Sequence, residues 1–410
     1  MNDHRRRVLL MASSMRGGGS EHQVALLAEH LPRNQFVVHL YLTHPVGELL
    51  DRIPADVTIH SPPPESRSLI TRVLNRWPGR VLRNHARFLD ELVQRENIDV
   101  VYDRTFHNTL IAGHPSIRSQ FRRVSTIVSP PDVALPMVER KFVELKRRRL
   151  ANAYQRSDTV IAVSAAVADS AASYYHLNRQ QIQVVFNPVD IAAIRAQSQQ
   201  SQAKQQHAEQ TATAPNRLRL VCVGRMTPEK GQTDLIAAIG LAANDWPDDA
   251  PKLTIQFIGD GPDRANLESA AAALTGSDNT IGGHRIEFAG VVSPATPSIA
   301  EADGLVLTSH FEGMPNVVLE AFALNTPVVA TQAGGTVELQ ADADHPTCFW
   351  AATNNPSSLA DALRRFASDE SGRSARIITA QAWVTGRHGI DAAVQQIAAL
   401  LTPSPHKPIP

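Results

Sequence analysis

The sequence predicts an α/β protein built on parallel sheets. Strand-like apolar runs alternate with segments of helical periodicity from one end of the chain to the other, a pattern that indicates parallel strands flanked by helices. A length of 410 residues suits two or three domains, and 43% hydrophobic residues is ample for their buried cores. Glycine-rich and charged segments follow several of the runs, at the strand ends where such sheets bind ligands.

The expected elements follow in order along the chain. In the first half we expect strands at residues 8–12, 36–42, 57–59, 100–102, 124–128, 159–163 and 184–186, with helices such as 21–31, 87–95 and 138–156 between them. In the second half we expect strands at 218–223, 253–258, 286–288, 304–308 and 327–330, and a helix at 316–324.

The domain boundaries are expected where the composition changes. Gln, Ala, Ser and Thr replace almost all bulky apolar side chains over residues 196–216. We therefore predict a first domain at 1–190, a flexible linker or insertion at 191–216 and a second domain from 217 onward. The proline-rich end of the chain, 403–410, is expected to be a disordered tail.

Composition also indicates in which cellular compartment the protein works. Cys222 and Cys348 are the only cysteines, too few for a disulfide framework, which favours a reducing environment. No apolar run approaches the roughly 20 residues of a spanning helix, and the run at 8–12 is too short for a secretory signal. We expect a cytoplasmic enzyme, in solution or peripheral on the inner face of the membrane, with no nucleic-acid partner.

Charge is distributed unevenly between the two halves of the chain. The first 190 residues hold 25 Lys and Arg against 18 Asp and Glu, a net charge of +7, and the remainder carries −7. A basic run occupies 146–149, and arginines interleaved with apolar residues are Arg67, Arg72, Arg76, Arg80, Arg83 and Arg87. These residues form either a solvated helix face or a surface that contacts phosphate groups or an anionic membrane, and the pattern leaves both open.

The segment 309–321 carries the strongest functional signal. Glu312 follows an apolar strand, and Glu320 lies eight positions later in a helix, across a Gly-Met-Pro loop. Such a loop directs backbone N–H groups and a helix N-terminus toward an anion such as a diphosphate. Carboxylates accept hydrogen bonds from the hydroxyls of a ribose or a sugar. Two glutamates at this spacing also fit a solvated helix face, but the loop and the preceding strand favour a site.

Two further motifs follow strands. Three glycines at 17–19 separate the first strand from a helix and allow close backbone approach to a ligand, although a simple turn has the same sequence. Arg225 and Lys230 stand five apart where the 218–223 strand turns into a helix. Cations there would neutralise a diphosphate and the charge that develops as it leaves. An ordinary surface loop with two cations is the alternative.

In their order along the chain, these motifs resemble the GT-B retaining glycosyltransferases of family GT4, also called glycosyltransferases group 1, and especially the polysaccharide and capsule-type members. The resemblance implies two Rossmann-like domains whose parallel sheets face each other across a cleft. It also ends the second domain at 375 and implies a helix within 376–402 that crosses back to the first domain. The matching segments are 17–21, 160–164, 187–190, 224–231, 259–262, 288–290, 312–320, 327–331 and 334–335.

The resemblance also assigns roles to residues. It implies that Arg225 and Lys230 hold the diphosphate, that Glu320 binds the ribose, and that Glu312 contacts the hydroxyls of the transferred sugar. Arg225, Lys230 and Glu312 are therefore the implied catalytic residues. The other implied donor contacts lie in the first-domain loop, beside the base, and at the sugar and distal phosphate: Gly18, Gly19, Phe288, Gly290, Gly313, Met314, Pro315, Asn316, Val317 and Val318.

Two positions depart from the family pattern. Many relatives carry a His after a first-domain strand, where this chain has Ser129, Pro130 and Pro131. His107 follows the preceding strand and could stand nearby, or it is an ordinary loop histidine. Asn325 occupies a turn where relatives usually have Gly, and Asn tolerates the left-handed conformation best among the other residues.

The predicted reaction is transfer of a sugar from a nucleotide-diphosphate sugar to a hydroxyl acceptor with retention of configuration. A UDP-linked hexose or N-acetylhexosamine is favoured, and the acceptor is expected to be lipid-linked or otherwise anionic, in polysaccharide or glycolipid biosynthesis. We expect no cofactor and no metal, because the one Asp-x-Asp motif, 342–344, falls in an expected surface loop. The alternatives are a catalytically weak nucleotide-sugar-binding scaffold, or an epimerase or phosphorylase on the same architecture.

Overall fold

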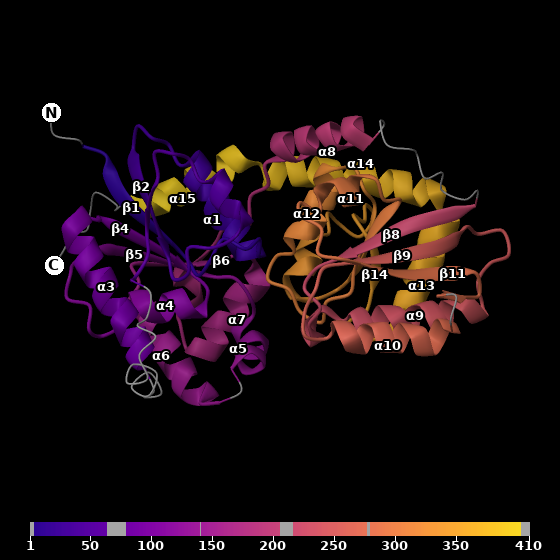
Figure 1. The fold of residues 1–410 in the computed structure, drawn as a ribbon, viewed down its shortest axis with the longest axis horizontal. Helices are drawn as coiled ribbons and strands as arrows, with labels where there is room; N and C mark the ends of the chain where they lie inside the picture. Colours follow the sequence, from indigo (N-terminus) through magenta and orange to yellow (C-terminus); the bar gives the residue numbers. More distant parts are fainter. Residues whose placement is uncertain (1–3, 64–78, 140, 206–215, 277–278, 403–410) are drawn as a thin grey trace. The chain divides into compact units, whose positions relative to one another are not determined.

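Two compact α/β units make up the protein. A computed structural model describes residues 4–63, 79–139, 141–205, 216–276 and 279–402. Unit 1 comprises Met1–Pro188 with Ile390–Pro410, and unit 2 comprises Val189–Gly389. Each unit is built on one seven-stranded sheet covered by helices (Figure 1). Within the described residues every pair of named strands is parallel except β10–β11, so the predicted fold class is confirmed.

The sheet of unit 1 has the strand order β3-β2-β1-β4-β5-β6-β7. The chain adds β1 to β3 toward one edge and β4 to β7 toward the other, so the order of the parallel strands reverses between β1 and β4. Its strands are β1 (Arg6–Ala12), β2 (Phe36–Leu42), β3 (Thr58–His60), β4 (Val100–Arg104), β5 (Arg122–Ile127), β6 (Thr159–Ala162) and β7 (Ile182–Val184). Its helices are α1 (Gly19–His30), α3 (Arg80–Glu96), α4 (Phe106–Ala112), α5 (Pro131–Val138), α6 (Val143–Gln155), α7 (Ala165–Tyr175) and α15 (Ile390–Leu401), with short 3₁₀ turns at Glu48–Arg52 and Arg179–Gln181.

Side chains of β1 alternate between two buried layers. Leu10 belongs to a cluster with residues of α1 and α15, whereas Leu9 and Met11 pack with Leu89 and Leu92 of α3. This alternation follows from the two-residue period of a strand. It explains why β1 reads as one apolar run, because helices cover both faces of the sheet.

The sheet of unit 2 has the order β10-β11-β9-β8-β12-β13-β14, which reverses between β8 and β12. Its strands are β8 (Arg217–Val223), β9 (Lys252–Ile258), β10 (Thr280–Ile281), β11 (His284–Gly290), β12 (Gly304–Leu307), β13 (Val328–Thr331) and β14 (Phe349–Ala351). Its helices are α8 (Ile191–Gln205), α9 (Gln232–Asn244), α10 (Arg264–Thr275), α11 (Thr296–Ala300), α12 (Asn316–Ala323), α13 (Pro356–Ser368) and α14 (Glu370–Arg387), with 3₁₀ turns at Pro228–Lys230 and Gly334–Leu339.

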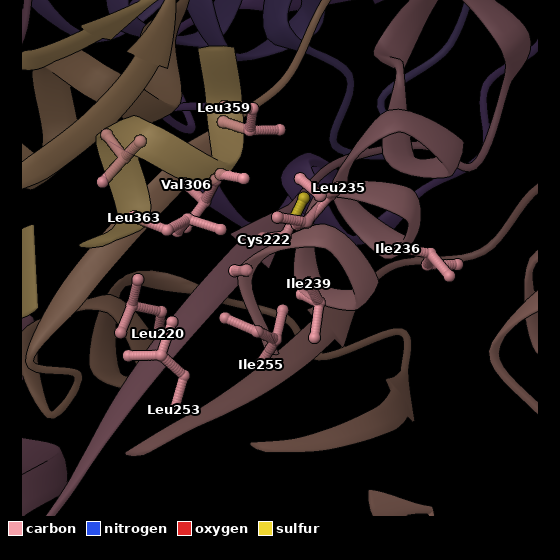
Figure 2. Close-up of a cluster of buried hydrophobic side chains, with 14 of the residues drawn as sticks. Leu220, Cys222, Leu235, Ile236, Ile239, Leu253, Ile255, Val306, Leu359 and Leu363 are labelled. Carbon is pink, nitrogen blue, oxygen red and sulfur yellow. The ribbon is translucent and has the colours of Figure 1, made fainter. Parts of the chain in front are cut away.

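The core of unit 2 lies between its sheet and helices α9 and α13. Figure 2 shows Leu220 and Cys222 of β8 among Leu235 and Ile239 of α9 and Leu363 of α13, and all of these side chains are buried. The core fixes β8 and α9 relative to each other, and therefore fixes the loop that joins them.

The linker predicted at 191–216 is wrong over its first part, because α8 forms there. Arg195 Nε donates to the carbonyl of Ala323 at 2.8 Å, and Thr296 Oγ1 donates to Gln197 Oε1 at 2.6 Å. Ala and Gln favour helices, and these bonds hold α8 against α11 and α12. Residues 206–215 and the predicted tail 403–410 lie outside the described residues, as do Arg67, Arg72 and Arg76.

Two other helix predictions need correction. The single helix expected at 376–402 is two helices, α14 and α15, and only α15 belongs to unit 1, where Val394 and Ile397 enter the core. The helix expected at 138–156 is interrupted before Val143, because Phe142 adopts a left-handed backbone conformation with φ of 59°. Among the described residues, no helix combines the length and apolar character needed to cross a membrane.

Candidate active site

The candidate site lies where the strand order of unit 2 reverses. Strand β8 pairs with β9 on one side and with β12 on the other, so the loops after β8 and β12 meet at the same edge of the sheet. Arg225 and Lys230 lie in the first of these loops, and Glu312 lies in the second. The fold thereby brings together motifs that are about 80 positions apart in sequence.

Lys230 and Glu312 form a direct ion pair. Lys230 Nζ donates to Glu312 Oε1 at 2.6 Å, and the two side chains are 29% and 12% exposed. Ser309 Oγ donates to the same carboxylate oxygen at 2.6 Å. The partly buried carboxylate is therefore held by one cation and one hydroxyl, and the lysine side chain remains the more exposed partner.

Three further contacts hold the two loops together. Thr308 Oγ1 donates to the carbonyl of Lys230 at 2.7 Å, and the His310 amide donates to the carbonyl of Glu229 at 2.8 Å. The His310 ring also bonds through Nε2 to a carboxylate oxygen of Asp234 in α9, at 3.0 Å. The sequence-based prediction did not include these residues, although a row of polar residues directly after an apolar strand is a signal that could have found Thr308 and His310.

Two glycines permit this close approach. Gly231 has φ of +62°, and a Cβ there would lie 2.2 Å from the carbonyl oxygen of Thr308. Gly334 has φ of +53°, and a Cβ there would lie 2.6 Å from the carbonyl oxygen of Glu312, which also accepts the Gly335 amide at 3.0 Å. A side chain at either position would both strain the backbone and push the loops apart.

The N-terminus of α12 offers backbone amides beside Glu312. The amide of Val318, which the resemblance assigns to the distal phosphate, donates instead to the carbonyl of Pro315 at 3.1 Å. Among the described residues, the amides of Gly313 and Val317 have no acceptor. The side chain of Met314 is buried, so it packs beneath the loop and leaves ligand contact to the backbone.

The other predicted donor residues of unit 2 lie in or after β8, β11 and β12 of the same sheet. The Arg225 side chain is exposed and has no ion-pair partner in the described part of the chain, and Glu320 is half-buried in α12. The Phe288 ring stacks on Phe257 with centroids 5.0 Å apart, so its ring belongs to the core. Gly290 accepts the Gly259 amide at 2.7 Å, which ties the end of β11 to the loop after β9.

Gly18 and Gly19 belong to unit 1, where they stand at the start of α1. The amide of Gly18 donates to Glu21 Oε2 at 2.8 Å, and Glu21 also accepts a bond from Ser14. The Gly18 amide is therefore engaged in capping α1. His107 is exposed in α4, with its ring edge-on to His85 at 6.0 Å.

The described side chains show which groups could bind a metal or act as a thiolate. Among them, no three His, Cys, Asp or Glu residues are grouped as a metal site. Burial raises the pKa of both the Cys222 and the Cys348 thiols to about 12, so these cysteines stay protonated at neutral pH. Asp342 is exposed and bonds to His345 in its own loop.

Comparisons with known proteins match both units. Residues 17–193 match the model of Glycosyltransferase Family 4, and residues 217–369 match that of Glycosyl transferases group 1. A putative teichuronic acid biosynthesis glycosyltransferase of Bacillus subtilis is 32% identical over 150 residues, which are 37% of this chain and 33% of the relative. A lipopolysaccharide core biosynthesis glycosyltransferase of Rhizobium meliloti is 26% identical over 186 residues, 45% of this chain and 50% of the relative. The chain thus spans between a third and half of the length of these two relatives.

Solved structures share the fold over nearly the whole chain. Anabaena HepE, crystallised with UDP and glucose, aligns with a TM-score of 0.72 at 21% identity, covering 97% of this chain and 99% of that one. WaaG, a glycosyltransferase of lipopolysaccharide biosynthesis, aligns with a TM-score of 0.68 at 16% identity, covering 97% and 100%. The two family matches together take in most of the chain, and the sheet topology agrees with them. The protein belongs to the GT4-type glycosyltransferases, the glycosyl transferases group 1, and has the GT-B fold.

Proposed function

We propose that the protein transfers a sugar from a nucleotide-diphosphate sugar to an acceptor hydroxyl with retention of configuration. The observation that carries this proposal is the Lys230–Glu312 pair at the point where the unit 2 sheet reverses. Arg225 stands in the same loop as Lys230. The amide of Gly313 follows Glu312 directly, and that of Val317 lies in the first turn of α12. Cations, a carboxylate and backbone donors on one edge match the three parts of such a donor: diphosphate, sugar hydroxyls and distal phosphate.

The ion pair implies that donor binding exchanges the partners of Lys230 and Glu312. Lys230 neutralises Glu312 in the ligand-free protein, so neither charge is left partly buried without a partner. A bound diphosphate would replace Glu312 as the partner of Lys230, and the sugar hydroxyls would replace the lysine at the Glu312 carboxylate. Each group then keeps a charge-assisted hydrogen bond, and the two bonds place the anomeric carbon relative to the leaving phosphate.

The proposed step is a front-face substitution. The bond between the anomeric carbon and the diphosphate oxygen breaks with its electron pair going to that oxygen, where Arg225 and Lys230 stabilise the negative charge. The acceptor oxygen forms the new bond to the anomeric carbon, and its proton passes to the departing phosphate oxygen. This route needs no separate base. We also propose that it needs no metal, because the two cations and the α12 N-terminus supply the positive field.

Two sets of relatives inform the donor and the acceptor. Anabaena HepE has been crystallised with UDP, with UDP and glucose, and with UDP-glucose. Curated relatives act in teichuronic acid and lipopolysaccharide core biosynthesis. We infer a UDP-linked hexose or N-acetylhexosamine as donor, and an acceptor of polysaccharide or glycolipid assembly that is lipid-linked or otherwise anionic. The basic surface of unit 1 would then bring the protein to an anionic membrane reversibly.

A donor panel tests the proposal. Thermal shift with UDP, GDP and ADP sugars identifies a binding donor, because a ligand at 100 times its Kd stabilises a protein by about 2.7 kcal/mol. Hydrolysis of that donor is then followed with and without simple glycoside acceptors. Binding with neither hydrolysis nor transfer would favour the scaffold alternative. Interconversion of one nucleotide sugar into another would favour an epimerase.

A further inference from the structure

A bond between an imidazole and a carboxylate joins the two loops of the candidate site. His310 Nε2 lies 3.0 Å from Asp234 Oδ2, and the two side chains are 30% and 23% exposed. His310 stands in the loop after β12, two positions before Glu312, and Asp234 stands in the first turn of α9, four positions after Lys230. The bond therefore links the same two segments as the Lys230–Glu312 ion pair.

Asp234 is a firmly held anchor for this bond. The next two residues of α9, Leu235 and Ile236, are buried in the core of unit 2 (Figure 2). The helix dipole also stabilises a carboxylate in the first turn of a helix. On the other side of the bond, a Cβ at Gly231 would lie 3.0 Å from His310 Nε2, so the imidazole lies directly against the backbone where α9 begins. The ring is held both by the carboxylate and by this backbone.

Donor binding would affect the two links between the loops differently. In the proposed function a diphosphate replaces Glu312 as the partner of Lys230, so the ion pair is lost when the donor binds. His310 and Asp234 take no part in that exchange. The remaining contacts between the loops, from the Thr308 hydroxyl and the His310 amide, end on backbone carbonyls. The His310–Asp234 bond is thus a link between side chains that persists in the donor complex.

The separation of the two loops matters for the proposed step. Lys230 would hold the leaving diphosphate and Glu312 would hold the sugar hydroxyls, so this separation sets the position of the anomeric carbon relative to the leaving oxygen. A displacement of about 1 Å can lower turnover by on the order of 100-fold. A bond that donor binding leaves intact would prevent such a displacement.

We propose that His310, oriented by Asp234, is a positioning residue for sugar transfer, which keeps the Lys230 and Glu312 loops at a fixed separation once the donor has broken the ion pair. The inference rests on the proposed function, because it concerns the donor complex. The bond should matter little in the ligand-free protein, where the ion pair joins the same loops, and most when a nucleotide diphosphate is bound. A bond that only supports the fold would matter equally in both states.

Kinetics and calorimetry of variants test the proposal with the donor that the panel identifies. His310→Ala should lower kcat roughly 10- to 100-fold and change UDP affinity by less than about threefold. Glutamine carries its amide nitrogen near the position of Nε2 and asparagine near that of Nδ1. His310→Gln should therefore restore most of kcat, whereas His310→Asn should not. Asp234→Ala should match His310→Ala, and the double variant should be no slower than either single variant.

His345→Ala is the matched control. His345 Nδ1 forms a 2.9 Å bond with Asp342 in the same unit, but within another loop, so this variant should behave like wild type. Hydrogen exchange adds a readout that needs no turnover. Exchange of the amides of residues 226–231 should be near wild type in ligand-free His310→Ala, and roughly tenfold faster than wild type with saturating UDP.

Each outcome decides the proposal. A kcat of His310→Ala equal to wild type, an equal loss in His310→Gln, or an equal loss in His345→Ala would each overturn it. Exchange that is faster to the same extent with and without UDP would assign the bond to the fold alone, and would also overturn it. In these cases wild type still turns the donor over, so the proposed function stands. Wild type that neither binds nor turns over any donor would overturn the proposed function, and this inference with it.

Discussion

Replacing Lys230 by Ala is expected to lower sugar transfer strongly while leaving the fold intact. Lys230 is the only cation within ion-pair distance of Glu312 among the described residues, and its Nζ lies 2.6 Å from that carboxylate. In the proposed complex the same ammonium group faces the leaving diphosphate. The substitution therefore removes the group that neutralises the Glu312 carboxylate in the ligand-free protein. The same group is proposed to stabilise the negative charge of the leaving diphosphate in the transition state.

The magnitude follows from these two roles. Loss of one preorganised charge-stabilising group lowers turnover by roughly two to three orders of magnitude. Loss of a charged hydrogen bond to the diphosphate weakens nucleotide binding by about 1.5–3 kcal/mol. Stability should fall by about 1–3 kcal/mol, because the substitution leaves the Glu312 carboxylate, which is only 12% exposed, with its bond to Ser309 alone.

The assay combines turnover, nucleotide titration and thermal unfolding. Arg219→Ala is the matched control, since Arg219 belongs to the same strand β8 and pairs with Glu301 at 3.8 Å, before the strand reaches the site. Arg225→Ala should resemble Lys230→Ala in turnover. Near-normal turnover in both Arg225→Ala and Lys230→Ala would refute the assigned diphosphate site, and an equal loss in Arg219→Ala would show that the effect is one of folding.

Three other predictions concern the carboxylates, metal dependence and pH. Glu320→Gln should weaken UDP binding by about 1–3 kcal/mol, whereas Glu312→Gln should spare UDP affinity and depress transfer; equal losses of affinity in calorimetry would contradict this division. Transfer should survive excess EDTA, and a complete loss restored by magnesium or manganese would refute metal independence. Burial lowers the pKa of His284 from 6.5 to about 4, so the unfolded chain binds a proton that the folded chain does not between these values, and stability should fall as pH drops from about 6.5 toward 4. At about 1.4 kcal/mol per pKa unit the loss is at most roughly 3 kcal/mol; a His284→Gln variant with an unchanged pH dependence of Tm would disprove this assignment.

Much of the architecture could be predicted because parallel strands buried on both faces leave clear apolar runs. The strands from β1 to β13 that were expected all form, within a few residues of their predicted ends. Asn325 confirms the turn prediction with φ of 60°. The two-residue strand β10 and the three-residue strand β14 were missed, because such short segments carry little periodicity.

Other features depend on tertiary contacts that local pattern does not encode. Helix α8 has the polar composition of a linker, and it is held by Arg195 and Gln197 bonding to distant elements. The break at Phe142 has no glycine or proline to announce it. The clamp between His310 and Asp234 joins residues 76 positions apart. Lys230 and Glu312 follow β8 and β12, and these strands are known to be neighbours only once the reversal of strand order between them is known.

The central claim is that the Lys230–Glu312 edge of unit 2 activates a nucleotide sugar for transfer with retention. Proton NMR of the reaction with the α-linked donor selected from the panel tests this most directly, because it follows release of the sugar and its anomeric configuration together. The account predicts that the product first appears as the α anomer, and that Lys230→Ala removes the signal while Arg219→Ala retains it. First appearance of the β anomer, or no release from any donor in the panel, would contradict the account.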